Sequence, residues 1–129
     1  MRVVVIEDEP DLRRLLVEEI ADLGHEAYEA SSGPAGIDLV REVQPHVICS
    51  DINMPEMDGH AVKEHLDNAG LIDGSTVFIF LSANATRTDI ADGLMAGAAH
   101  YFTKPIDFDR LAAVLDRVAA TLSGNGAPE

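Results

Sequence analysis

A shortage of cysteine and of long apolar runs limits what this 129-residue chain can be. The one cysteine, Cys49, has no second cysteine in the chain to pair with, so an internal disulfide framework is excluded. This favours a reducing compartment, and we expect the protein to be cytoplasmic. The apolar runs are too short to cross a bilayer, so no membrane span is expected.

Basic residues are also few. Nine lysines and arginines stand against 23 aspartates and glutamates, which gives a formal net charge of -14. Such a chain repels nucleic acid phosphates and anionic lipids, so we expect this domain to bind neither directly. Its acidity instead suits divalent cations or a partner with a basic surface.

Several motifs of enzymes are missing. The five histidines are scattered, without the spacing of a zinc site. No glycine-rich phosphate-binding loop of the GxGxxG or GxxxxGK[ST] type is present. Cys49 lies in an apolar run and is expected to be a small core residue.

Strand-like runs alternate with helix-like runs along the chain. Strands are expected at residues 2–7, 25–30, 46–50, 76–81 and 100–103, each followed by apolar residues at helical spacing. The run at 76–81 is apolar throughout, as in a strand that is covered on both faces. The alternation predicts an α/β fold, with one parallel sheet and helices on both of its faces.

One helix expected from this pattern spans residues 86–96. Its apolar residues are Ile90, Ala91, Leu94 and Met95. Their spacing predicts that all four face the sheet.

The length predicts a single domain, which we expect to span residues 1–122. Residues 123–129 contain Ser, Gly, Asn and Pro and indicate a flexible tail or the start of a linker. The chain is therefore expected to be either a stand-alone regulator or one part of a longer protein.

Polar residues follow four of the expected strands. Glu7 and Asp8 stand where the first strand ends, and Asp51, Ser82 and Lys104 follow the third, fourth and fifth. In a parallel sheet these carboxyl ends share one edge, where ligands usually bind. The sequence therefore predicts that the five side chains gather at that edge.

Three carboxylates at one edge repel one another, and each raises the pKa of the others. A magnesium ion, which prefers oxygen ligands, would relieve this repulsion. The alternative for Glu7 and Asp8 is that they only favour the N-terminus of the first helix.

A carboxylate such as Asp51 can act as a nucleophile and form an aspartyl phosphate. The Lys104 ammonium and the Ser82 hydroxyl could stabilise the phosphoryl oxygens. Singly, Asp51 could cap a turn, Lys104 could be a surface lysine and Ser82 could end a strand. Their joint placement favours phosphoryl chemistry.

These residues, in this order, resemble the receiver domain of two-component response regulators. The resemblance covers about residues 2–122. It rests on the acidic pair Glu7-Asp8, the run D-x-x-M-P-x-M-D-G from Asp51, Ser82-Ala83 and Lys104-Pro105. It implies a doubly wound, five-stranded parallel sheet in the order 2-1-3-4-5, the flavodoxin-like and CheY-like arrangement.

The resemblance also implies a role for each residue of a metal site. Asp51 is expected to be the phosphoacceptor. Asp8 and Asp51 are expected to bind Mg²⁺ directly, or Mn²⁺ in its place, with the backbone carbonyl of Asn53 as a third ligand. Glu7, where Asp is commoner in the family, would act through a water molecule.

Other residues are implied to bind the phosphoryl group or to respond to it. Ser82, where Thr is commoner, would be the switch hydroxyl, and Lys104 would pair with the phosphate. Tyr101 would turn inward when Ser82 moves, although an ordinary half-buried aromatic fits its position equally well. Ala83 and Pro105 would support the site, with a cis peptide before Pro105.

The implied function is a phosphorylation switch. A sensor histidine kinase or a histidine phosphotransfer protein would phosphorylate Asp51 and so change the helix at 86–96, the strand at 100–103 and the last helix. The output would be a downstream protein, a missing effector domain or a phosphorylation-dependent dimer. The domain would assist only its own phosphorylation and dephosphorylation, and would not otherwise be an enzyme.

Two alternatives remain at this point. One is a magnesium-dependent aspartyl phosphatase, although Asp51-Ile52-Asn53 lacks the second acid of a D-x-D site. The other is a receiver-like module that binds its partner independently of phosphate. The complete set of acids, hydroxyl and lysine argues against the second alternative.

Overall fold

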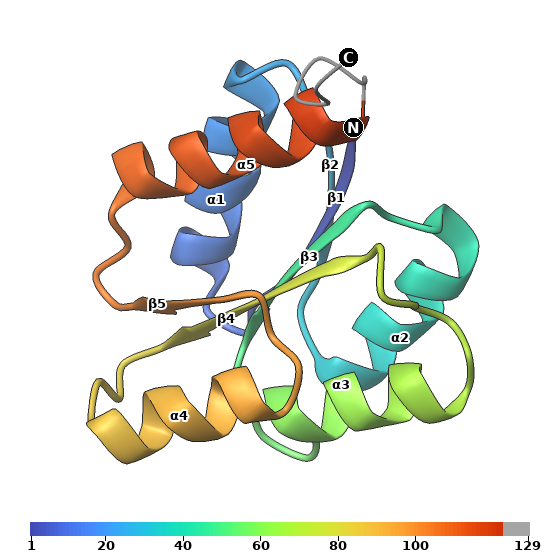
Figure 1. The fold of residues 1–129 in the computed structure, drawn as a ribbon, viewed down its shortest axis with the longest axis vertical. Coiled ribbons are helices and arrows are strands. Elements are labelled where there is room, and N and C mark those ends of the chain that lie inside the picture. The colour runs from blue at the N-terminus through green and yellow to red at the C-terminus, as the bar shows by residue number, and fades with distance from the viewer. Residues whose placement is uncertain (123–129) are drawn as a thin grey trace.

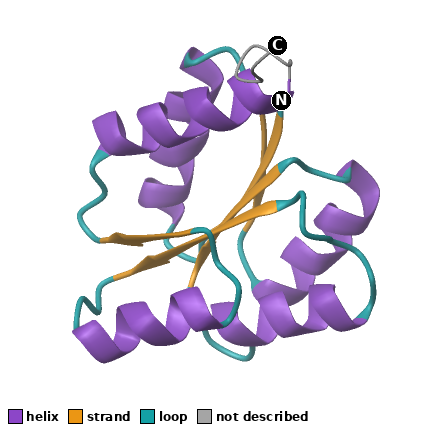
Figure 2. Ribbon diagram, in the orientation of Figure 1, coloured by secondary structure: helices purple, strands orange, loops and turns teal. Residues whose placement is uncertain are grey.

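Five parallel strands form one sheet with helices on both faces in the computed structural model, which describes residues 1–122 (Figure 1, Figure 2). The strands are β1 (Arg2–Ile6), β2 (Glu26–Ala30), β3 (Val47–Asp51), β4 (Val77–Ser82) and β5 (His100–Thr103). The helices are α1 (Pro10–Asp22), α2 (Gly33–Val43), α3 (Gly59–Asn68), α4 (Arg87–Met95) and α5 (Phe108–Leu122). The strand order is β2-β1-β3-β4-β5, so the predicted fold class and topology are confirmed.

The alternation of side chains along the strands divides the core into two layers. On one face of β1, Val3 and Val5 pack with residues of α1 and α5, such as Leu16 and Leu115. On the other face, Val4 and Ile6 belong to a cluster with residues of α2 and α3. Figure 1 shows the same division, with α1 and α5 on one side of the sheet and α2, α3 and α4 on the other. Both faces of the central strands are therefore apolar, as the sequence predicted for β4.

The orientation predicted for α4 is wrong for three of its four apolar residues. Leu94 is 46% exposed, Met95 is 86% exposed, and Ala91 is also exposed. The residue of α4 that is buried is Gly93, where an added Cβ would lie 2.8 Å from the Tyr101 ring. The helix backbone approaches the sheet through this glycine, which turns the larger apolar side chains toward solvent.

None of the helices in residues 1–122 is both long enough and apolar enough to span a membrane. The expected tail at 123–129 lies outside the described residues.

Candidate functional site

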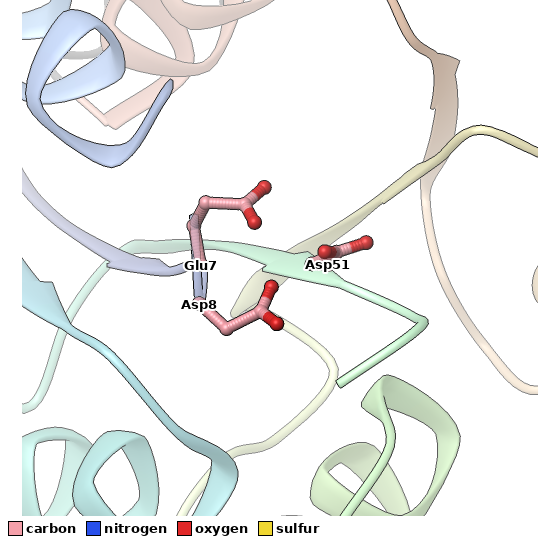
Figure 3. Close-up of side chains that lie close together, drawn as sticks. All are labelled: Glu7, Asp8 and Asp51. Carbon is pink, nitrogen blue, oxygen red and sulfur yellow. The ribbon is translucent and has the colours of Figure 1, made fainter. Parts of the chain in front are cut away.

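The carboxyl ends of β1 and β3 bring three carboxylates together, as Figure 3 shows. Glu7 and Asp8 directly follow β1, and Asp51 is the last residue of β3. β1 and β3 are neighbours, with Ile6 opposite Ser50, so both strands end side by side. One oxygen of each carboxylate lies within 4.8 Å of the others.

The loop after Asp51 is held close to the end of β3. The Gly59 N–H donates to the carbonyl of Ile52 at 2.8 Å, and a Cβ on Gly59 would collide with the carbonyl oxygen of Asp51. Asp58 then caps α3 by accepting from the Ala61 N–H at 2.8 Å. The D-G pair of the motif thus supplies both the close approach and the helix start that place Asp51.

Lys104 reaches two of the acids from the end of β5. Its Nζ lies 3.0 Å from Asp51 Oδ2 and 3.0 Å from Glu7 Oε1. The Lys104–Pro105 bond that follows β5 is cis, in agreement with the expectation from the resemblance. Burial alone would lower the pKa of Lys104, but its contacts with Glu7 and Asp51 outweigh this and raise the pKa overall.

Glu7 is the most deeply buried acid of the site, with 0% exposure. Burial is the main cause that raises the pKa of Glu7, to about 7, and the nearby charge of Asp51 contributes. The Glu9 N–H donates to Glu7 Oε2 at 3.1 Å. Glu7 Oε1 accepts no hydrogen bond from the described residues and has only the ion pair with Lys104.

This donor set fits a divalent cation. The ligand atoms are all carboxylate oxygens, which Mg²⁺ prefers, and they are close enough to share one ion. The buried Glu7 Oε1 has an unused acceptor position that a metal-bound water could fill. An added positive charge would also relieve the repulsion that raises the pKa of Glu7.

Ser82 lies at the end of β4 and is fully buried. Its Oγ accepts from the Asn84 N–H at 3.0 Å and from Asn53 Nδ2 at 3.4 Å. Tyr101 is 6% exposed, and its hydroxyl donates to the carbonyl of Asn84 at 2.8 Å. Ser82 and Tyr101 therefore meet at one residue, Asn84.

The predicted residues thus lie at one edge of the sheet. Asp51 contacts Lys104 directly, and Asn53 links Asp51 to Ser82, since the Asn53 N–H lies 3.4 Å from Asp51 Oδ1. The sequence did not indicate Asn84, which contacts Ser82 and Tyr101 through its backbone. Any residue type except proline could make these backbone hydrogen bonds, so the sequence contained no signal for the role of Asn84.

Comparison with known proteins decides the family. A family model described as the response regulator receiver domain matches residues 3–116. Chemotaxis protein CheY of Thermotoga maritima is 31% identical over 120 residues, which cover 92% of this chain and 97% of that protein. The chain belongs to the response regulator receiver family.

The receiver domain is also similar to longer proteins and to solved structures. Regulatory protein AtoC of Escherichia coli is 33% identical over 117 residues, which are 90% of this chain and 24% of AtoC. The receiver domain of Francisella response regulator 1452 has the same fold, with a TM-score of 0.85, 24% identity and coverage of 94% and 98% of the two chains.

The receiver domain spans nearly all of the CheY relative, but only about a quarter of AtoC and 53% of the probable transcriptional regulator ycf27 of Porphyridium aerugineum. The family is a signalling domain of two-component systems rather than an enzyme with an external substrate. Neither the phosphatase nor the phosphate-independent module is favoured by these relatives.

Proposed function

We propose that this receiver domain accepts a phosphoryl group on Asp51 from a sensor histidine kinase or a histidine phosphotransfer protein in the cytoplasm. The observation that carries the proposal is the contact of Asp51 with Lys104 beside the acids Glu7 and Asp8. In the transfer, a carboxylate oxygen of Asp51 forms a bond to phosphorus while the bond between phosphorus and the donor histidine nitrogen breaks.

Asp8, Asp51 and the Asn53 carbonyl are proposed to hold Mg²⁺, or Mn²⁺, with Glu7 acting through water. The bound cation would neutralise charge on the transferring group. Lys104 already lies 3.0 Å from Asp51 Oδ2, so its ammonium can move to a phosphoryl oxygen with little rearrangement. Ala83 and Pro105 flank Ser82 and Lys104 and are proposed to support them.

The phosphoryl group is proposed to recruit Ser82, and this would alter the contacts of Asn84 and Tyr101. These residues adjoin α4 and β5, so α4, β5 and α5 would shift between two states and change the affinity for a partner. The partner is a downstream protein, an effector domain or a second copy of the chain. With a net charge of -14, direct nucleic acid or membrane binding is not proposed.

The test is incubation with acetyl phosphate, in Mg²⁺ or in EDTA, followed by intact mass measurement. We expect the mass of one phosphoryl group to be added in Mg²⁺ and not in EDTA. Asp51→Asn should remain unmodified and folded, because the amide is nearly the same size but is not a nucleophile. Asp38→Asn, an exposed acid on α2, is the matched control and should be modified as the wild type is. Modification of Asp51→Asn at the wild-type rate would refute the assignment.

A further inference from the structure

One buried charge in the described residues has no place in the phosphorylation site. The buried polar side chains are those of Glu7, Ser50, Asp51, Lys63 and Ser82. Ser50 Oγ donates to the carbonyl of Asp51 at 3.0 Å, and three of the others form the site itself. Lys63, on α3, is only 8% exposed. Lysines are almost never buried so deeply unless they are paired.

The ion pair of Lys63 does not explain its burial. Its Nζ donates to Asp67 Oδ2 at 2.6 Å, one turn further along the same helix. Asp67 is 44% exposed, and an (i, i+4) pair of this kind forms equally well on a solvated helix surface. A second contact must account for the direction that the lysine side chain takes.

That second contact is the end of α4. A Cβ added to Gly97 would lie 2.9 Å from Lys63 Nζ and 3.5 Å from its Cε, so the ammonium lies directly against this glycine. The same ammonium is 5.9 Å from the centroid of the Phe78 ring on β4. Lys63 therefore extends across the sheet face from α3 to the segment that ends α4.

The C-terminal end of α4 is a favourable place for a positive charge, and the last turn of this helix supplies none. Gly97 has a φ of +102°, and the N–H groups of Gly97 and Ala98 donate to the carbonyls of Leu94 and Gly93. A helix C-terminus carries partial negative charge, and the last turn of α4 contains no basic residue. The ammonium of Lys63 supplies that charge from a neighbouring helix.

The opposite end of α4 is held differently. Asn84 lies three residues before α4 begins, and its carbonyl accepts a hydrogen bond from the Tyr101 hydroxyl at 2.8 Å. Its N–H donates to Ser82 Oγ at 3.0 Å. The N-terminal end of α4 is therefore tied to the residues proposed to respond to phosphorylation, whereas the C-terminal end is tied to α3.

We propose that Lys63 is a positioning residue that anchors the C-terminal end of α4, so that phosphorylation moves only the N-terminal end. We call the contact of Lys63 with the Gly97 end of α4 the anchor, and the phosphorylation-dependent movement of the other end the pivot. The pivot rests on the proposed function, whereas the anchor does not. When Ser82 and Tyr101 move on phosphorylation, their hydrogen bonds displace Asn84 and the start of α4. The helix then rotates about its other end, which Lys63 holds in place. Leu94 and Met95, exposed near the anchored end, then keep nearly the same positions.

The anchor is tested by amide hydrogen exchange of the whole chain, without any phosphoryl donor. Lys63→Met keeps the length of the side chain and removes its charge. We expect the amides of Gly97 and Ala98 to exchange about tenfold faster in this variant, because the helix end loses a buried favourable charge. Asp67→Asn breaks the ion pair within α3 but leaves the lysine in place, and these two amides should then exchange within about threefold of the wild-type rate.

Exchange at the β1 amides serves as the internal reference for global stability. If Lys63→Met accelerates β1 and the Gly97 amide equally, the lysine acts on overall stability and the anchor is refuted. Unchanged exchange at Gly97 and Ala98 would refute it too, as would an equal acceleration in Asp67→Asn.

The pivot is tested by amide NMR spectra with beryllofluoride and Mg²⁺. In the wild type, shift changes in α4 should be concentrated at residues 84–90 and be small at residues 94–98. In Lys63→Met they should extend to both ends. Equal changes at both ends of the wild-type helix would refute the pivot. The absence of any change at Asp51 and Ser82 would refute the proposed function and the pivot with it, while the exchange experiment would still decide the anchor.

Discussion

At the carboxyl edge of the sheet, two buried acids share one lysine, whereas at the amino edge three half-buried histidines lie at or just before the starts of strands. Glu7 and Asp51 both contact Lys104 at 3.0 Å. The histidines are His25, His46 and His100, next to β2, β3 and β5. The same backbone topology therefore presents negative charge at one edge and largely neutral rings at the other.

At the amino edge, Arg2 and His46 form hydrogen bonds with neutral partners. His46 Nδ1 accepts from the Arg2 N–H at 2.9 Å. The Arg2 guanidinium donates to the carbonyls of Val43 and Gln44, where α2 ends with Gln44 at a φ of 52°. These contacts satisfy the last carbonyls of α2, which have no partner within the helix.

The carboxyl edge leaves part of its charge unbalanced. One lysine faces two acids, and the pKa of Glu7 is raised to about 7, first by burial. Strongly perturbed ionisable groups of this kind are typical of functional sites, because the imbalance is relieved when a ligand binds. Electrostatic strain is thus concentrated at the edge that we propose to be phosphorylated.

Removal of Lys104 should give the largest effect on stability. Lys104→Met leaves two buried carboxylates without their cation, and we expect a loss of about 3 kcal/mol in the free energy of unfolding at pH 8 in EDTA. Urea unfolding followed by circular dichroism measures it. Arg41→Met breaks an exposed pair with Asp38 and should change stability by less than about 0.5 kcal/mol. If both variants lose equally little, the carboxyl edge holds no such strain.

Neutralisation of Glu7 should have a smaller effect of the opposite sign. The pKa of Glu7 in the folded state, about 7, exceeds its ordinary value of 4.5. Its favourable contribution is therefore fully present below pH 4.5 and is lost as the pH rises through about 7. Glu7→Gln resembles the protonated acid, so at pH 8 without metal it should be more stable than the wild type by about 1–2 kcal/mol.

The difference between Glu7→Gln and the wild type should shrink as the pH is lowered toward 5 in the same unfolding measurements. The variant should also bind Mg²⁺ more weakly, which a calorimetric titration would detect. A Glu7→Gln protein that is less stable than the wild type at pH 8 would show that the carboxylate is well paired in the folded state.

Much of this arrangement could be predicted because its signals are local. An apolar run that ends in an acid, hydroxyl or lysine can be recognised within a few residues of sequence. Parallel topology then brings such strand ends together at one edge of the sheet. The cis bond before Pro105 followed only from the resemblance, since most X-Pro bonds are trans.

The failures of prediction have a common physical cause. Hydrophobic periodicity placed Leu94 and Met95 inward because it gives weight to large apolar side chains, whereas α4 packs through Gly93. The burial of Lys63 was equally hidden, because its contact with Gly97 depends on how two helices lie in space. The orientation of α4 and the burial of Lys63 both depend on contacts between elements, which the residue pattern of a single helix does not reveal.

The smallest expected effect concerns the amino edge. Burial is the first cause that lowers the pKa values of His25, His46 and His100 below 6.5, and neighbouring positive groups such as Arg2 and Arg110 add to it. The unfolded chain therefore binds protons first as the pH falls below 6.5, and stability is lost in that range. Acid therefore lowers stability through the histidines of the amino edge, whereas it raises stability through Glu7 at the carboxyl edge.

His46→Asn should isolate the contribution of one histidine. An amide oxygen can accept the Arg2 N–H in place of Nδ1 but does not titrate, so the melting temperature should fall less steeply than in the wild type between pH 6.5 and about pH 5. Differential scanning calorimetry at several pH values measures the slope. His65→Asn, on the exposed side of α3, is the control and should keep the wild-type slope. If His46→Asn also keeps the wild-type slope, His46 does not contribute to the acid sensitivity, and the contrast between the two edges would rest on His25 and His100.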